Sequence, residues 1–506
     1  MNMKTIKYFL SVLLIVAMSA CDLQRDDFTE ISPDNFPKTE KDLQLAANAL
    51  YYYFTAGEWG DKCIYSAGYG GYQVISDMST DALWSCWGWQ SDDLYYQQWY
   101  ASMSGSVADL LYENFSHYNF LSLARNTIRR MEASDAPEDA KTLYTAEVHA
   151  LRGWMALYLY DLFGPVPVAP DDVLDNPTTF TYLPRLTDEE YDAMMEEDLN
   201  FAIEHLPRTA DSGRMTQGAA RMILLKYYMI RGFYEKAEAL ARDLAAMEGN
   251  PYQLFTNYNA IFEKANNGNN EVILDLPCSS AVEWHANHMT SEVLPADMPW
   301  TENSTGWGGY VMPWDFYNTF EEGDLRLEKI ITSYVNKNGK EIDKTNSSQL
   351  WYGALPLKYG KDTEMADSHS GVNVVVYRFS DVLLTLAECI VRNNGAVTAE
   401  AVALVDRVRN RAGLPGLSAE ATGSVDAFFD ALLLERGHEF YLEGLRRQDL
   451  IRFGKYVEYA NLRINDANKT NTDYTYFNVD ESHNRFFIPQ TFINESKSAI
   501  KQNPGY

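Results

Sequence analysis

FSDVLLTLAECIVRNNGAVTAEAVALVDRVRNRA, residues 379–412, predicts two helices separated by a short turn. Apolar residues recur every three or four positions in each half, which is the spacing of one buried helix face. Asn394-Gly395 lies between the halves and supplies the residues that commonly end a helix. We therefore expect a helical hairpin with helices at 379–393 and 398–412. The apolar positions are Leu383, Leu386, Ala387 and Ile390, then Ala401, Leu404, Val405 and Val408.

A second hairpin is predicted more than 130 residues earlier, at 218–230 and 234–247, with a break at Gly232. Small and large apolar residues alternate on its faces, so the two helices can pack closely. The arrangement resembles a tetratricopeptide-type repeat, in which stacked helix pairs bury a shared core. Further helices are expected at 41–53, 143–163, 188–206 and 425–445, and one helix is led by Leu110, Asn114, Tyr118 and Leu121.

The segment between the hairpins, about 250–376, has a different composition. NNGNNEVILDLP contains one short strand, and the tryptophans that follow stand among Gly, Pro and Asn, which is typical of loops. Loops on a rigid scaffold often hold binding residues. Flanking glycines in TGWGGY favour an exposed ring at Trp307, with Tyr310 beside it, whereas Trp314 fits a core position better. Trp300 is a further candidate ligand contact, and Trp284 stays undecided.

Residues 77–100, DMSTDALWSCWGWQSDDLYYQQWY, hold four tryptophans and three tyrosines among aspartates, with no Lys or Arg. Flat aromatic faces suit the apolar C–H faces of sugars, and carboxylates or amides suit sugar hydroxyls. The stretch therefore indicates a carbohydrate-binding face, although the same rings could be ordinary core residues. The candidate stacking rings are Trp84, Trp87, Trp89 and Trp99, and the candidate hydroxyl partners are Asp77, Asp81, Gln90 and Asp92.

The N-terminus, MNMKTIKYFLSVLLIVAMSAC, has the form of an export signal. Two lysines precede an apolar run at 8–18, which is too short to span a bilayer. Small residues directly before Cys21 resemble a bacterial lipobox, so we expect residues 1–20 to be removed and Cys21 to be lipidated. Ordinary secretory cleavage is the other reading of the segment. Residues 22–36 then form a polar tether, and 21–506 a single body held to a membrane by its lipid.

Charge and motif content exclude several functional classes. Loss of residues 1–20 removes two lysines and no acid, so the formal charge of −29 becomes −31, and a nucleic-acid partner is excluded. No catalytic fingerprint is present, and we expect neither a cofactor nor a metal site, because His285 and His288 lack a third ligand. The cysteines after Cys21 form no CxxC pair, so buried thiols are expected, while a Cys63–Cys86 bridge stays possible.

Five segments in order resemble the SusD/RagB family of outer-membrane nutrient-binding lipoproteins from the Bacteroidetes. They are AEVHALRGWMALYLYDLFGPVPV, NEVILDL, VYRFSDVLLTLAECIVRNNG with VDRVRNRAGLP, ERGHEFYLEGLRRQDLIRFGKY, and FFIPQ with the final NPGY. The charged residues of the fourth segment, from Arg436 to Asp449, are expected to form a structural ion-pair network.

The resemblance implies a mainly α, SusD-like fold, in which tetratricopeptide-type hairpins at about 114–248 and 379–412 form the scaffold. Loop-rich regions with a few short strands, at about 60–105 and 250–376, would face the ligand. It also implies a surface-exposed, non-catalytic lid on a TonB-dependent β-barrel transporter in the outer membrane, with an oligosaccharide as ligand. A peptide-binding lid and a glycoside hydrolase are the alternatives.

Overall fold

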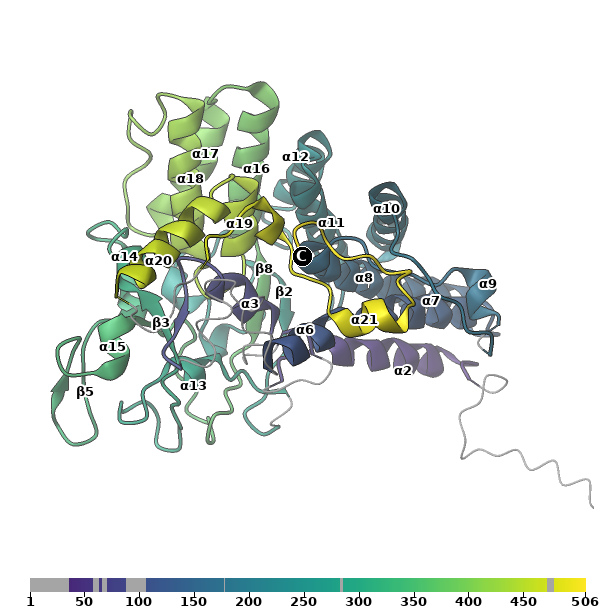
Figure 1. The fold of residues 1–506 in the computed structure, drawn as a ribbon, viewed down its shortest axis with the longest axis horizontal. Helices are drawn as coiled ribbons and strands as arrows, with labels where there is room; N and C mark the ends of the chain where they lie inside the picture. The colour runs from purple at the N-terminus through teal and green to yellow at the C-terminus, as the bar shows by residue number, and fades with distance from the viewer. Residues whose placement is uncertain are drawn as a thin grey trace, which may run out of the picture.

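The structure is a computed structural model, and it describes residues 36–57, 63–65, 71–87, 106–176, 178–282, 285–470 and 477–506. Helices make up about half of the structure, and in Figure 1 many of the loops of the central part of the chain gather at one side. The predicted mainly α fold, with a loop-rich elaboration and short strands, is confirmed.

The first helical group packs around α8, whose side chains are buried almost throughout from Tyr144 onward. A helix that is apolar on every side belongs in the interior. Gly153 lets α10 approach closely, since a Cβ there would lie 2.7 Å from a Leu199 methyl carbon. The single helix expected around 110–121 is wrong: two helices meet at His117, whose ring bonds to the Asn114 carbonyl. The group comprises α2 (Glu40–Tyr51), η1 (Tyr52–Phe54), α6 (Ser106–Ser116), α7 (Tyr118–Glu132), α8 (Glu138–Phe163), α9 (Asp171–Leu174) and α10 (Asp188–His205).

Both predicted hairpins are confirmed. The first is α11 (Gln217–Arg231) with α12 (Tyr234–Ala245), and the second is α16 (Phe379–Asn394) with α17 (Ala399–Arg411). Each first helix ends at a glycine in the left-handed region, Gly232 at φ 73° and Gly395 at φ 64°. Helices α12 and α16 pack directly against each other, so the two hairpins form one stack despite their separation in sequence.

The C-terminal part departs from the sequence prediction at one helix. The helix expected at 425–445 ends at Phe440, because Leu442 and Gly444 both take positive φ values, 62° and 76°. The freed carbonyls of Glu439 and Tyr441 accept hydrogen bonds from Lys358 instead (3.1 and 2.7 Å). The helices here are α18 (Val425–Phe440), α19 (Arg446–Arg452), α20 (Tyr456–Thr470), η6 (Glu481–Asn484) and α21 (Gln490–Glu495).

The C-terminal tail is tied down. Asn503 donates to the carbonyls of Phe163 and Phe486 (3.1 and 2.7 Å), and the Tyr506 hydroxyl donates to Arg485 O (3.0 Å). These bonds satisfy the carbonyl of the last residue of α8 and fasten the chain end to the first helical group.

Within the described residues, the strands form three small antiparallel sheets. One sheet has the order β1-β3-β7-β4, and the others pair β2 with β8 and β5 with β6. The strands are β1 (Trp84–Ser85), β2 (Val272–Leu276), β3 (Tyr310–Pro313), β4 (Ile330–Ile331), β5 (Tyr334–Val335), β6 (Glu341–Ile342), β7 (Gly353–Pro356) and β8 (Val374–Arg378). Short helices accompany them: α3 (Tyr72–Met78), η2 (Tyr258–Ala260), η3 (Lys264–Asn266), α13 (Met289–Val293), α14 (Trp314–Tyr317), η5 (Leu325–Lys329) and α15 (Ser348–Tyr352).

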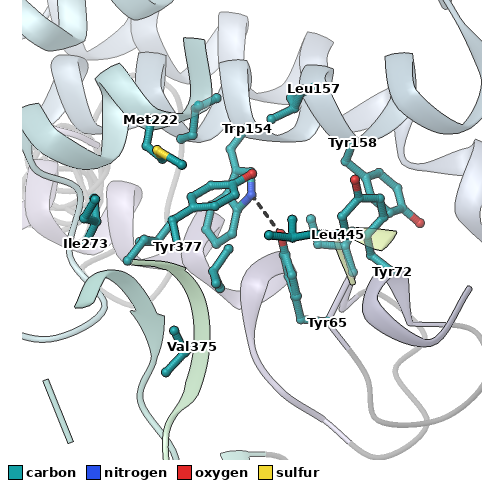
Figure 2. Close-up of a cluster of buried hydrophobic side chains, with 14 of the residues drawn as sticks. Tyr65, Tyr72, Trp154, Leu157, Tyr158, Met222, Ile273, Val375, Tyr377 and Leu445 are labelled. Atoms are coloured by element: carbon teal, nitrogen blue, oxygen red, sulfur yellow. Dashed lines mark hydrogen bonds between the residues drawn. The ribbon is translucent and has the colours of Figure 1, made fainter. Parts of the chain in front are cut away.

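An aromatic core joins the helical scaffold to the loop-rich part (Figure 2). Trp154 of α8 stacks on Phe54 at 4.3 Å and donates its indole N–H to the Tyr65 hydroxyl (3.2 Å). Tyr72 of α3 lies edge-on to Tyr158 of α8, with ring centroids 5.3 Å apart. The core therefore fixes the position of α3, which leads into β1.

The predicted ion-pair network around α18 and α19 is confirmed as a buried structure. Arg436 bonds to Asp449 (2.8 Å), Arg447 bonds to Asp161 (2.9 Å), and Glu439 pairs with Arg378. All of these side chains are at most a few per cent exposed, so each charge depends on its partner for solvation.

The four cysteines in the described ranges are all free thiols, so Cys63 and Cys86 are not bridged. Cys63 and Cys389 are buried as expected, whereas Cys86 and Cys278 are partly exposed. Within the same ranges, every helix is too short or too polar to span a bilayer.

Candidate ligand-binding platform

Three aromatic rings lie side by side on the surface of the four-stranded sheet. Trp351 is 67% exposed and Tyr352 is 42% exposed, and their rings stand nearly at right angles (87°, centroids 4.9 Å apart). Tyr352 is nearly parallel to the half-buried Trp84 (15°, 6.1 Å). We call Trp84, Tyr352 and Trp351 the aromatic platform. Trp351 and Tyr352 are its exposed rings, and exposure of a ring is what stacking on a ligand requires.

Strand pairing brings these distant residues together. Trp84 of β1 is opposite Val311 of β3, and Gly353, the residue after Tyr352, is opposite Pro313 of the same strand. Residues two apart on a strand lie on the same face of the sheet, so pairing with β3 sets the distance between Trp84 and Tyr352. A Cβ at Gly353 would lie 2.0 Å from the Met312 carbonyl oxygen, so this close strand approach requires a glycine.

Helix α15 holds the exposed rings rigidly. The Ser347 side chain accepts the Leu350 N–H (3.1 Å) as an N-cap, and Leu350 is fully buried. Gln349 donates to the carbonyls of Val293 (2.8 Å) and Tyr310 (3.3 Å), which ties the helix to α13 and β3. Because its inner face is fixed, α15 presents Trp351 without a large ordering cost when a ligand binds.

Polar groups lie beside the platform. Trp314, half-buried at the start of α14, donates its indole N–H to the Leu350 carbonyl (2.9 Å), and Lys344 lies over its ring at 5.4 Å. The neighbouring Asp315 has a side chain 78% exposed and pairs with Arg463 at 2.8 Å. Such exposed carboxylate and ammonium groups can exchange hydrogen bonds with hydroxyls of a ligand.

Trp87 continues the aromatic segment next to the sheet. It is half-buried and tilted against Tyr310 (60°, 5.8 Å), and a Cβ at Gly309 would lie 2.5 Å from its ring. Gly309 is therefore the residue that admits this indole. Tyr310 is fully buried, so its ring supports Trp87 from inside and is closed to a ligand in this structure.

The structure changes the interpretation of Asp77 and Asp81. Asp77 is 1% exposed, and its carboxylate accepts the backbone N–H groups of Gly444 (3.0 Å) and Arg446 (3.3 Å). Burial raises the pKa of Asp77 to about 7, against the opposing effect of those hydrogen bonds. Asp81 holds the Arg446 guanidinium with both oxygens, each at 2.8 Å. Both carboxylates thus bind the protein itself, and the sequence could not reveal their distant partners.

The second predicted patch lies around α13. Trp307 is half-buried and parallel to the buried His288 (9°, 6.3 Å). Trp300 is also half-buried, with Lys361 4.8 Å above its ring. His285 is exposed while His288 is buried, and within the described ranges no three His, Cys, Asp or Glu side chains gather as metal ligands. Trp307 and Trp300 therefore stay candidates for a ligand, separate from the platform.

Several predicted site residues cannot be placed. Trp89, Gln90, Asp92, Trp99 and Cys21 lie outside the described residues, as does Trp284. Their suggested roles stay predictions from the sequence.

Comparison with known proteins shows which family the chain resembles. Residues 270–506 match the model of the SusD family. A SusD-like protein of Bacteroides ovatus is 26% identical over 73% of this chain and 71% of its own. The starch-binding protein SusD of Bacteroides thetaiotaomicron is 24% identical, with both chains covered completely. The chain is therefore similar to the SusD/RagB family, by the family model over residues 270–506 and by these two relatives over most or all of its length.

A solved structure of another protein has the same fold. Surface glycan-binding protein A of Bacteroides thetaiotaomicron, in complex with laminarihexaose, superposes with a TM-score of 0.67 over 92% of this chain and 100% of its own, at 20% identity. Residues 270–506, which match the family model, include β3, α15 and β7, and α15 carries two of the three platform rings.

Sequence reasoning missed Trp351 and Tyr352, the two most exposed rings of the platform. They stand in NSSQLWYGALP, where a polar run with a Ser cap precedes the aromatic pair and a glycine follows it. At the end of this short helix, both adjacent aromatic rings are exposed. That pattern was the available signal.

Proposed function

We propose that this chain is a surface-exposed outer-membrane lipoprotein of the SusD/RagB type that binds an oligosaccharide on the aromatic platform and passes it to a TonB-dependent transporter. The observation that carries the proposal is the exposure of two platform rings: Trp351 is 67% and Tyr352 is 42% exposed on a short helix fixed to the sheet, with the half-buried Trp84 parallel to Tyr352. Such a site binds by capture and needs no catalytic group.

The chemistry favours a neutral glycan. A sugar ring presents a face of C–H groups that stacks on an indole or phenol, and its hydroxyls point outward to polar neighbours such as Asp315 and Lys344. The formal charge of −29 would repel an anionic ligand, whereas it has no net effect on an uncharged one. Two relatives support this ligand class, because one is named a starch-binding protein and the other holds laminarihexaose.

The membrane anchor is proposed from the lipobox-like segment before Cys21. Lipid on that residue would hold the body at the membrane, where a transporter partner could receive the ligand. Cys21→Ala should shift the protein from the membrane fraction to the soluble fraction and abolish palmitate labelling. Labelling that persists in the variant would contradict the anchor.

The ligand class is tested with the mature body, residues 22–506, on an array of oligosaccharides and peptides. The proposal predicts retention on glycans and none on peptides. Binding to peptides alone would identify a peptide-binding lid of the same family. Release of new reducing ends from a bound polysaccharide would instead show a hydrolase.

A further inference from the structure

We propose that Asp77 and Asp81 are positioning residues for the aromatic platform. They fasten the segment 79–87, which carries Trp84 and Trp87, to the turn at 441–446. The inference deepens the proposed function and rests on it, because it concerns the same platform.

Asp77 lies just before the segment 79–87. It lies one residue before the end of α3, and its own carbonyl accepts the backbone N–H (3.1 Å) and the hydroxyl (2.5 Å) of Thr80. Its carboxylate reaches across to Gly444 and Arg446, which are more than 360 residues away in sequence. One aspartate therefore shapes the start of the segment and attaches it to the C-terminal part of the protein.

Asp81 makes the second attachment four residues later. Its two oxygens accept Nε and Nη2 of Arg446, both at 2.8 Å, in the bidentate geometry that fixes orientation best. Arg446 is itself held, since Nη1 donates to the Leu433 carbonyl (2.9 Å) and the guanidinium lies 5.2 Å above the Phe316 ring. The segment is thus attached to a side chain that has little freedom.

The turn at 441–446 also anchors the chain segment that carries Trp351 and Tyr352. Lys358, two residues after β7, donates to the carbonyls of Glu439 and Tyr441 and pairs with Glu443. Strand β7 directly follows Tyr352. The two chain segments that carry the platform rings therefore meet at one buried turn, so the attachments there help to set the distance between Trp84 and Tyr352.

The attachment by Asp77 depends on its protonation. The carboxylate accepts one N–H on each oxygen, and a proton on either oxygen turns that acceptor into a donor facing an N–H. The charged groups that act on Asp77 are Lys358, which favours ionisation, and Glu443, which opposes it, and burial raises the pKa to about 7. Lys358 has its pKa lowered by burial to about 8, so it stays mostly charged below that pH.

The direction in which ligand affinity changes with pH distinguishes a positioning role of Asp77 from a general effect on stability. Between about pH 4 and pH 7 the folded state keeps a proton on Asp77 that the unfolded state has lost, so this group's contribution to stability falls as the pH rises. Ligand affinity should move in the opposite direction. If only protein with an ionised Asp77 holds the platform rings in place, the fraction of protein able to bind ligand is about one-tenth at pH 6 and nine-tenths at pH 8. Ligand affinity is then about tenfold weaker at pH 6.

The first test needs no ligand. Hydrogen–deuterium exchange at pH 8 compares wild type, Asp77→Asn, and Asp211→Asn, a control at an exposed carboxylate of the scaffold. Asparagine places an N–H₂ group opposite a backbone N–H, so loss of one hydrogen bond should speed exchange at 79–87 about fivefold, with α8 unchanged. Asp81→Asn should also speed it. Exchange at 79–87 that matches wild type in both variants would overturn the proposal.

The second test measures glycan affinity by calorimetry between pH 6 and pH 8, with the array's best oligosaccharide. Wild type, Asp211→Asn and Asp81→Asn should bind about tenfold more weakly at pH 6 than at pH 8, whereas Asp77→Asn should be weak and should lose this tenfold rise. A melting temperature for Asp77→Asn at pH 8 at or above that of wild type would show that folding is intact. A flat wild-type profile would refute control by Asp77. A wild type that binds no glycan at any pH would refute the proposed function, while the exchange data still decide the positioning role.

Discussion

Removing the Trp351 ring should weaken glycan binding by about thirty-fold without destabilising the protein. A tryptophan can bury about 250 Å², and Trp351 is 67% exposed, which leaves roughly 170 Å² open. A sugar stacked on one face would cover about half of that, roughly 80 Å². At about 25 cal/mol per Å² this is about 2 kcal/mol, or about thirty-fold in Kd.

The assay is isothermal titration calorimetry of Trp351→Ala against the oligosaccharide that wild type binds best. Phe180→Ala is the matched control, because that ring is 77% exposed on a scaffold loop away from the sheet. Both variants should unfold within about 0.5 kcal/mol of wild type, since neither side chain is buried. Affinity of Trp351→Ala within threefold of wild type would refute the stacking argument. A large loss in Phe180→Ala would show that exposed rings matter for another reason.

Three further predictions concern the scaffold. Glu439→Gln should cost about 3–5 kcal/mol in urea unfolding, because three buried arginines each lose one of their carboxylate partners; a loss below 1 kcal/mol would contradict this. Burial lowers the pKa of His438 well below 6.5, so its contribution to stability is present above that pH and falls in more acidic solution. His438→Gln should flatten the change in unfolding free energy from pH 7 to pH 5, and an unchanged slope would count against it. Gly444→Ala should lower the melting temperature more than Gly395→Ala, since only the first Cβ meets another backbone, 2.7 Å from Gln73 Cα; equal losses would argue otherwise.

The helical scaffold was predictable because its signals are local. The hairpin at 379–412 carries its apolar spacing, its N-cap at Thr398 and its terminating Gly395 within 34 residues of sequence. The end of α18 was not predictable in the same way. The chain leaves the helix after Phe440, and the carbonyls of Glu439 and Tyr441 bond to a distant lysine, Lys358, which no local pattern could reveal.

The candidate site was only partly predictable, because ring exposure depends on pairing between distant segments. The aromatic composition of 77–100 drew attention to Trp84, yet it gave no means of separating that ring from the buried carboxylate of Asp77. Asp77 has its partners beyond residue 440, and Trp84 meets Tyr352 only through β3. Spacing along one segment cannot encode such contacts.

The most direct test of the central claim is retention of the mature body on a glycan array, compared with the double variant Trp351→Ala/Tyr352→Ala. The account predicts that wild type is retained on at least one class of neutral oligosaccharide, and that the folded double variant is not. Equal retention of both proteins, or retention of wild type on peptides alone, would contradict it.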